Sequence, residues 1–381
     1  MMKKKICLCT MLLILVMALG GCKAKAQKEI KSNIDFEDLT RTESVELSYA
    51  DQFGVEKYGV YDLITIVDSG RFLLVPEGED IPDNIPEDIV VLQQPLDKVY
   101  LVSTSAMDLV RAVDSISNIR LSGSKEDGWY VEEAAEAMKR GDMLYAGKYN
   151  TPDYELILNE GCDLAVENTM IYHNPEVKEK LEELGIPVLV ERSSYEKHPL
   201  GRLEWVKLYG ILFDREDEAD QFYDQQLKKI EPIMHKENNG CSAAFFYVTS
   251  NGAVNVRKPG DYISQMIGLA GGSYILKDLD NADENELSTM NMQMEDFYAA
   301  AKDADVLIYN STIDGELHSM DDLIQINGLF SDFKAVQNQN VYCTSNNFFQ
   351  KTTGTSEFIE DLNKIFTKSD TEDYTYLKKL R

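Results

Sequence analysis

Along the middle of the chain, apolar and polar residues follow two patterns that take turns. Short apolar runs predict strands, and the segments between them repeat apolar residues at helical spacing. The predicted strands are Val99–Val102, Asp163–Val166 and Val188–Val190, and the predicted helices are Ala106–Val113, Val131–Met138, Pro152–Leu158 and Pro175–Leu184. Strands that alternate with helices in this way favour a parallel sheet covered on both faces.

The same alternation of predicted strands and helices occurs again nearer the carboxyl end. The predicted strands there are Ala243–Val248, Val306–Tyr309 and Val341–Cys343, and the helices are Tyr262–Leu269, Met294–Ala301 and Ser356–Phe366. Between the two halves, Leu203 to Met234 is mostly helical with a break near Asp214, and its second part starts at Glu216. We therefore expect an α/β protein: two Rossmann-like lobes with mostly parallel sheets, joined by a long helix.

The amino-terminal part has different patterns. Residues 23 to about 45 are polar and predict a flexible tether, and the alternation in Tyr61–Val67, the turn at Asp68–Gly70 and the return to Val75 predict a hairpin. The expected organisation is a signal at 1–21, a tether at 22–45, a first lobe at 46–203 with the hairpin region 60–76, an interdomain helical segment at 204–238, a second lobe at 239–368 and a tail at 369–381.

The first 22 residues predict where the protein resides. Lys3, Lys4 and Lys5 precede an apolar run from Ile6 to Leu19, which is short for a transmembrane helix. The sequence LGGC at 19–22 then matches a lipobox, so we expect lipid on Cys22 and anchoring outside the cytoplasm at the cell membrane. The alternative is an ordinary secretory signal or a short membrane anchor.

Composition narrows the function classes. The 381 residues carry 38 basic and 66 acidic side chains, a net charge of −28, and loss of residues 1–21 would remove three lysines and leave −31. A surface this acidic repels phosphate backbones, so we expect no nucleic-acid partner. With 44% hydrophobic residues the chain is globular rather than disordered.

Cysteines and histidines are scattered. Cys162, Cys241 and Cys343 remain in the mature chain without a CxxC pair, which favours buried free thiols, although a disulfide between two of them stays open. The four histidines are dispersed, so we expect no metal site. The chain has no HExxH, no GxSxG and no GxGxxG after a strand, which favours a binding protein over an enzyme.

Four segments carry a family likeness. They are LVERSSYEKHPLGRLEW at 189–205, AGKYNTPDYE at 146–155, ENTMIYHNPEV at 167–177 and STMNMQME at 288–295. Together they resemble the solute-binding lipoproteins of ABC transporters for ferric siderophores, cobalamin and haem, the helical-backbone class of periplasmic binding proteins. The likeness spans roughly residues 95–368. It implies that the helix between the lobes is rigid, that the ligand cleft lies between the two lobes and that closure on ligand is small. We expect a monomer that delivers ligand to membrane permease subunits driven by a cytoplasmic ATPase.

The resemblance also implies two docking residues for the permease. In such proteins one glutamate on each lobe, near the start of a helix, meets arginines of the permease. Glu155 and Glu295 fit those positions, and a carboxylate in the first turn is favoured by the helix dipole. Asp153 and Asp296 are close rivals, and ordinary charges at helix starts are the alternative.

Ligands of parallel α/β lobes meet the loops at the carboxyl ends of the strands. On the first lobe this rule selects Ser103, Thr104, Lys148, Tyr149, Arg192 and Tyr195, and on the second lobe Asn251, Arg257, Lys258, Tyr309, Asn310, Phe348 and Lys351. Cations would bind carboxylates, and aromatic rings would cover a flat organic ligand.

Several of these residues have a structural alternative. The alternatives to ligand contact are an ion pair for Arg192, a position at a hairpin edge for the charges of Arg257 and Lys258, and packing at the rim of the cleft for Tyr149 and Tyr195. For Met290, Met292 and Met294 packing is favoured over contact with a haem, and for His198 a capping role is favoured over metal binding.

We expect a ferric siderophore as the ligand, with cobalamin or haem as alternatives and no intrinsic cofactor. A lipid-anchored extracytoplasmic hydrolase is the alternative from another class, and a non-transport sensor or adhesin lobe is a third.

Overall fold

The computed structural model describes residues 34–234, 237–279, 288–313, 315–369 and 373–381. Cys22 and the predicted signal lie outside the described residues. Two units are distinct. In the small one, residues 34–38 meet residues 80–85 through a bridge between Asp35 and Asp83, beside the short helix η1 (Phe36–Asp38). The large unit comprises residues 39–79 and 86–381.

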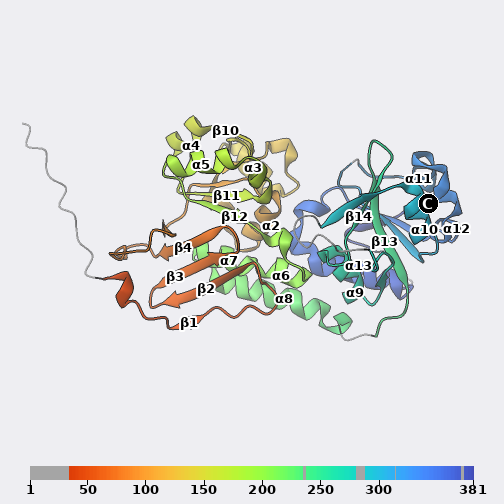
Figure 1. Ribbon diagram of the computed structural model, residues 1–381, viewed down its shortest axis with the longest axis horizontal. Coiled ribbons are helices and arrows are strands. Elements are labelled where there is room, and N and C mark those ends of the chain that lie inside the picture. The colour runs from red at the N-terminus through yellow and green to blue at the C-terminus, as the bar shows by residue number, and fades with distance from the viewer. Residues whose placement is uncertain (1–33, 235–236, 280–287, 314, 370–372) are drawn as a thin grey trace, which may run out of the picture. The chain divides into compact units, whose positions relative to one another are not determined.

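The amino-terminal part of the large unit is a five-stranded sheet (Figure 1). Its strands are β1 (Glu43–Ser44), β2 (Phe53–Tyr58), β3 (Tyr61–Ile66), β4 (Gly70–Val75) and β5 (Ile89–Gln93). They pair in chain order, and β3 and β4 form the predicted hairpin. Strand β1 pairs with β2, so residues 43 and 44, which we assigned to the flexible tether, belong to the sheet because their backbones find hydrogen-bond partners there.

The first lobe contains a parallel sheet in the order β12-β11-β6-β7-β8. Its strands are β6 (Val99–Leu101), β7 (Ile119–Ser122), β8 (Leu144–Tyr145), β11 (Leu164–Asn168) and β12 (Val188–Glu191), and its helices are α2 (Thr104–Ala112), α3 (Glu132–Arg140), α4 (Tyr154–Glu160) and α5 (Pro175–Glu183). Helix α4 begins two residues after the predicted start, because Pro152 pairs in the β9 (Gly147–Lys148) and β10 (Thr151–Pro152) ribbon and Asp153 caps the helix.

Three helices lead from the first lobe to the second. They are α6 (Pro199–Glu204), α7 (Val206–Phe213) and α8 (Glu216–Met234). The predicted break is confirmed at Asp214, which adopts a left-handed conformation with φ 57°. Helix α8 contacts α2 of the first lobe and α13 (Thr355–Phe366) of the second, so the predicted joining helix is confirmed.

The second lobe contains a mixed sheet in the order β16-β14-β13-β17-β18-β19, with β15 also on β13. Its strands are β13 (Ser242–Val248), β14 (Val254–Arg257), β15 (Ser273–Tyr274), β16 (Thr289–Met292), β17 (Val306–Tyr309), β18 (Val341–Thr344) and β19 (Leu377–Lys379). Its other helices are α9 (Tyr262–Leu269), α10 (Met294–Ala301), α11 (Met320–Ile326) and α12 (Lys334–Gln337).

The carboxyl end belongs to this sheet. Strand β19 pairs antiparallel with β18, so the predicted boundary at residue 368 and the separate tail at 369–381 are wrong. The buried carboxylate of Asp361 fixes the start of this segment, because it accepts hydrogen bonds from the amides of Thr375, Tyr376 and Leu377 at 2.7–3.2 Å.

Short 3-10 helices connect these elements. They are η2 (Ile116–Asn118), η3 (Glu126–Gly128), η4 (Thr169–His173), η5 (Ser193–Tyr195), η6 (Gly328–Asp332), η7 (Phe348–Gln350) and η8 (Thr352–Gly354). Across the described residues, no helix combines the length and apolar character needed to cross a membrane.

Candidate solute-binding site

The loops at the carboxyl edge of the first lobe hold a fixed cluster around Arg192. Its buried guanidinium stacks on the ring of Tyr195 at 4.5 Å and donates to Oε1 of Gln52 at 3.2 and 3.3 Å. It also lies 3.4 Å from the carboxylate of Asp68. The structural alternative for Arg192 therefore has direct support, while the ring of Tyr195 keeps an exposed face.

Two other predicted residues of this lobe differ in their access to solvent. Ser103 is buried, and its hydroxyl donates to Glu191 at 3.0 Å, so it orders the end of β12 instead of facing solvent. Lys148 is exposed at the end of β9, where it pairs with Thr151 of β10. Tyr149 packs against the apolar cluster of the first lobe, which supports its role as a packed rim.

On the second lobe, three predicted residues are tied into local structure. Tyr309 is 2% exposed and packs edge-on against Phe246, so the prediction that it faces a ligand is wrong: its ring is part of the core. Asn310 is buried and accepts hydrogen bonds from Thr312. Asn251 is exposed but accepts from the Thr249 hydroxyl at 2.5 Å, which shapes the turn before β14.

Arg257 lies at the end of β14 and does not project into solvent. Its guanidinium lies 5.6 Å from the ring centres of Phe245 and Tyr262, and 3.5 Å from the carboxylate of Asp261. The neighbouring Lys258 is half-buried. Arg257 is thus a packed residue with aromatic contacts, and it is not an exposed charge on the hairpin edge.

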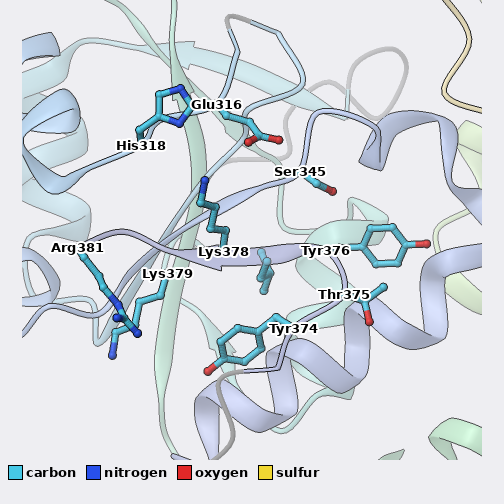
Figure 2. Close-up of a pocket in the computed structure, with 10 residues that line it drawn as sticks. Glu316, His318, Ser345, Tyr374, Thr375, Tyr376, Lys378, Lys379 and Arg381 are labelled. Carbon is cyan, nitrogen blue, oxygen red and sulfur yellow. The ribbon is translucent and has the colours of Figure 1, made fainter.

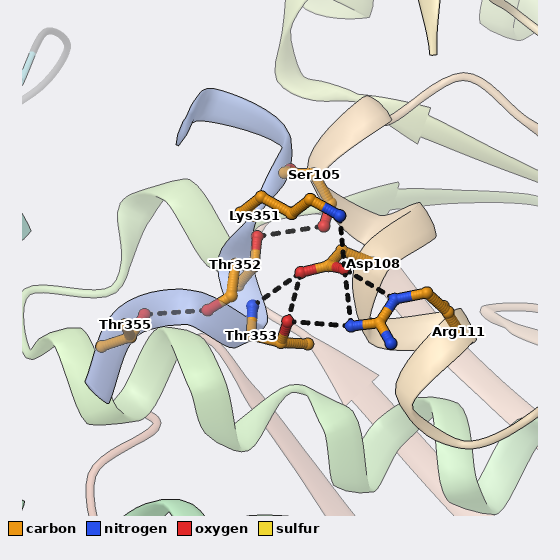
Figure 3. A network of polar contacts seen from close by, with 7 residues as sticks. All are labelled: Ser105, Asp108, Arg111, Lys351, Thr352, Thr353 and Thr355. Atoms are coloured by element: carbon orange, nitrogen blue, oxygen red, sulfur yellow. Dashed lines mark hydrogen bonds and ion pairs between the residues drawn. The ribbon is translucent and has the colours of Figure 1, made fainter. Parts of the chain in front are cut away.

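The segment 348–355 of the second lobe joins the first lobe through a polar network (Figure 3). Asp108 of α2 accepts from the Thr353 amide at 2.9 Å and from the Thr353 hydroxyl, and Nε of Arg111 donates to it at 2.9 Å. The Thr352 hydroxyl donates to the backbone oxygen of Ser105 at 3.0 Å. Of the predicted residues, Lys351 lies at this junction, with its ammonium 3.9 Å from the Asp108 carboxylate, and Thr104 is the first residue of the helix that carries Asp108.

A second set of contacts reinforces this junction. The side-chain amide nitrogen of Gln350 donates to the backbone oxygen of Gly128 at 2.7 Å. The side-chain oxygen of Gln350 accepts from the backbone amide of Tyr130 at 2.8 Å. The rings of Tyr130 and Phe349 meet edge-on at 6.0 Å, and they remain 45% and 40% exposed. One exposed aromatic ring from each lobe therefore lies at the junction. The rule on strand ends selects the loop 346–351 that contains Phe349, but it does not select Tyr130.

The neighbouring Phe348 turns inward instead. Its ring stacks within 4.3 Å of Phe358 and lies beside a small crevice. The residues that line the crevice are Arg202, Tyr262, Met266, Phe348, Lys351, Thr352 and Thr355. Only Phe348 and Lys351 of these were predicted from the sequence. Arg202 and Tyr262 belong to helices, and the rule that selects loop residues passes over them.

A pocket of about 530 Å³ lies elsewhere in the second lobe, along β18 and β19 (Figure 2). Its lining is rich in cations, and it is formed by Glu316, His318, Ser345, Tyr374, Thr375, Tyr376, Leu377, Lys378, Lys379 and Arg381. None of the predicted ligand residues contributes to it. We assigned 369–381 to a tail and therefore did not predict this pocket, which forms because β19 joins the sheet.

The two predicted docking glutamates lie at comparable positions. Glu155 is exposed in the first turn of α4, which Asp153 caps by accepting from the Leu156 amide at 3.0 Å. Glu295 is exposed in the first turn of α10. Both carboxylates are therefore available to a partner, one on each lobe.

The remaining sequence expectations concern metal and sulfur chemistry. Among the described residues, no group of three or more His, Cys, Asp or Glu side chains could hold a metal ion. Cys162, Cys241 and Cys343 are free thiols, and burial raises the pKa of Cys162 to about 12 and of Cys241 to about 11. His198 caps α6 by accepting from the Leu200 amide at 3.2 Å, and Met290, Met292 and Met294 pack into the core of the second lobe, as expected.

Comparison with known proteins agrees with this architecture. A family model described as periplasmic binding protein matches residues 119–347. An uncharacterized lipoprotein of Methanocaldococcus jannaschii is 23% identical, over 96% of this chain and 93% of its own length.

Solved structures share the fold. A periplasmic heme-binding protein of Vibrio cholerae superposes with a TM-score of 0.56 at 14% identity, over 72% of this chain and 98% of that one. A possible iron-binding periplasmic solute-binding protein of Staphylococcus epidermidis gives 0.54 at 15% identity, over 71% and 99%. With the family model matching more than half of the sequence, this chain belongs to the periplasmic binding protein family.

Proposed function

We propose that this protein is the solute-binding lipoprotein of an ABC importer and that it captures an iron chelate at the junction of its two lobes. The supporting observation is the pair of exposed rings, Tyr130 and Phe349, one from each lobe, with Lys351 two residues after Phe349 in the same segment. Aromatic faces cover flat organic ligands, and a cation attracts the oxygen atoms of a chelate.

The expected ligand is a ferric siderophore. Haem and a corrinoid are the alternatives, since the similar structures include a haem-binding and a possible iron-binding protein. Tyr195 and Lys148 are exposed at the edge of the first lobe and would extend the contact surface. In this proposal Cys22 carries the lipid that holds the protein at the outer face of the cell membrane, and Glu155 and Glu295 dock on the permease.

The hydrolase alternative gains no support from the site. Among the carboxyl groups near the first-lobe sheet, burial raises the pKa most for Glu167, to about 8, and for Glu196, to about 7. Both are buried, and Glu196 accepts hydrogen bonds from two backbone amides and from Trp205. Neither carboxyl group is accessible to a substrate.

A thermal-shift screen tests the proposal. Purified protein is heated with ferric siderophores, with haem and with cobamides, and a tight ligand raises the melting temperature with the logarithm of its concentration. We expect a ferric siderophore to give the largest rise, and the variants Tyr130→Ala and Phe349→Ala to reduce it. A flat response to all three ligand classes would contradict the proposed function.

A further inference from the structure

The guanidinium of Arg202 is buried with an aromatic ring as its main neighbour. Arg202 belongs to α6, is 8% exposed, and lies 4.3 Å from the ring centre of Tyr262. Among the described residues it makes no ion pair, and its Nε is buried without a hydrogen-bond partner. Such burial is costly, because the Nε–H group is removed from water without gaining a hydrogen-bond acceptor.

The surrounding groups leave an excess of positive charge. Arg257 lies on the same tyrosine ring, at 5.6 Å, and its carboxylate neighbour is Asp261 at 3.5 Å. Lys351 has its nearest carboxylate, Asp108, at 3.9 Å, and that carboxylate is already held at 2.9 Å by Arg111. Arg111, Arg202, Arg257 and Lys351 thus face two carboxylates.

The negative charge of Asp261, the carboxylate in this group, is disfavoured by its burial. Asp261 is buried, and burial raises the pKa of its carboxyl group, although the guanidiniums of Arg257 and Arg202 act in the opposite direction. Oδ2 of Asp261 accepts no hydrogen bond among the described residues. The compensation of Arg202 by Asp261 is therefore incomplete.

The crevice beside Arg202 has room for little more than one oxygen-bearing group. Its free volume is about 10 Å³, close to the space of a single water molecule. Lys351 and Phe348 close it on the side of the second lobe, within the segment that Asp108 anchors through Thr353. Only one oxygen atom fits in this space, so a larger ligand would place the oxygen at the tip of one arm there and keep its remaining atoms outside the crevice.

We propose that Arg202, together with Lys351, binds an anionic oxygen, carboxylate or phenolate, on one arm of the transported chelate. This inference rests on the proposed function and narrows its ligand to chelates with a net negative charge or with carboxylate arms. A guanidinium with unused N–H groups binds such oxygens at short range with charge-assisted hydrogen bonds. Uncharged chelates would leave Arg202 without a partner.

Calorimetric titration of the full chain with two probes tests the inference. The probes are an anionic ferric tricatecholate and an uncharged ferric trihydroxamate. The variant Arg202→Met keeps the aliphatic stem, and Arg140→Met, which removes an exposed arginine of the first lobe, is the matched control. We expect Arg202→Met to weaken the anionic probe about 10- to 100-fold, the value of one or two charge-assisted hydrogen bonds. Binding of the uncharged probe should not change.

The ligand-free protein supplies a second readout. Because Arg202→Met removes a buried charge, its melting temperature without ligand should equal or exceed that of the wild type. A wild type that binds the anionic probe, with Arg202→Met binding it equally well, overturns the inference and leaves the proposed function standing. A wild type that prefers the uncharged probe also overturns it. A wild type that binds neither probe nor haem nor a cobamide counts against the proposed function itself.

If Arg202→Met fails to fold, Arg202→Lys keeps the charge and takes its place. Loss of the planar N–H groups should then weaken the anionic probe more than the uncharged one. In the wild type, added salt should weaken the binding of the anionic probe and leave the binding of the uncharged probe unchanged. An equal salt dependence of binding for both probes would contradict the inference.

Discussion

Asp108 accepts hydrogen bonds from both the backbone amide and the side-chain hydroxyl of Thr353, which lies 245 residues later in the sequence. Asp108 is fully buried, on helix α2 of the first lobe, and Thr353 lies in the 3-10 helix η8 of the second lobe. This pair, with Arg111 beside it, fixes the segment that carries Phe349 and Lys351 at the junction (Figure 3).

The first prediction concerns this carboxylate. Replacing Asp108 by Asn removes a charge that Arg111 and Thr353 are arranged to meet, so Asp108→Asn should lower the free energy of unfolding by about 2–4 kcal/mol. Urea unfolding followed by fluorescence measures the change. Asp127→Asn, at an exposed position of the same lobe, is the control and should leave the midpoint in place. Equal midpoints for the two variants would show that the pair contributes no stability.

Glu167 predicts a pH dependence. Its carboxyl group is fully buried, neither oxygen has a hydrogen-bond partner among the described residues, and burial raises its pKa from 4.5 to about 8. The folded state thus holds a proton that the unfolded state releases, so stability is greatest below the unfolded pKa and falls as pH rises towards 8. The decline should approach about 1.4 kcal/mol per pH unit between the two values.

Thermal unfolding of Glu167→Gln from pH 5 to pH 9 checks this sign. The variant should lose this component of the pH dependence and should be more stable than the wild type at pH 8. Glu179→Gln, at an exposed position on α5, should keep the wild-type slope. A Glu167→Gln profile parallel to that of the wild type would refute the prediction.

Two glycines in helices, Gly210 and Gly268, differ in the space that a side chain would find there. A Cβ on Gly210 of α7 would lie 2.7 Å from Cβ of Ala219 and 2.9 Å from the backbone oxygen of Arg215, where the helix turns back into α8. Gly210→Ala should therefore cost about 1–3 kcal/mol by overpacking. A Cβ on Gly268 of α9 meets nothing within 4 Å, so Gly268→Ala should be neutral or stabilising by up to about 1 kcal/mol. Similar unfolding midpoints in both variants would contradict close packing at α7 and α8.

The docking proposal makes a prediction about transport. Reversing charge in the double variant Glu155→Arg and Glu295→Arg should reduce uptake of the ligand about tenfold or more, since arginines opposite arginines repel. Ligand affinity in solution should not change. The control reverses Glu133 and Asp321, which are exposed in the first turns of α3 and α11. Normal uptake by the Glu155 and Glu295 variant, or an equal loss in the control, would argue against docking at these residues.

The sequence predicted the elements of the two lobes well where apolar residues repeat over a whole strand or helix. The strand Val306–Tyr309 and the helices Tyr262–Leu269 and Met294–Ala301 were predicted to the residue. Strands β7, β14 and β16 were missed, because they are only four residues long and each includes polar positions. The tail was misassigned because β19 is a strand only through its pairing with β18.

Site residues were harder to predict. The rule that ligands meet the carboxyl ends of strands selects positions but not side-chain directions, so it included Tyr309, whose ring points into the core. It did not select Tyr130. Arg192 illustrates the same limit. A cation in a loop looks available from the sequence, but Gln52, Asp68 and Tyr195 occupy its guanidinium once the chain is folded.

The sequence by itself determined the two α/β lobes, the break at Asp214 and the family likeness, because all three depend on local periodicity and short motifs. Only the tertiary structure decided which charges have partners. Asp108 meets Thr353, and Arg202 lies against the ring of Tyr262, because of contacts between residues far apart in the chain. Local sequence does not encode such contacts, since they depend on how whole helices and sheets pack against one another.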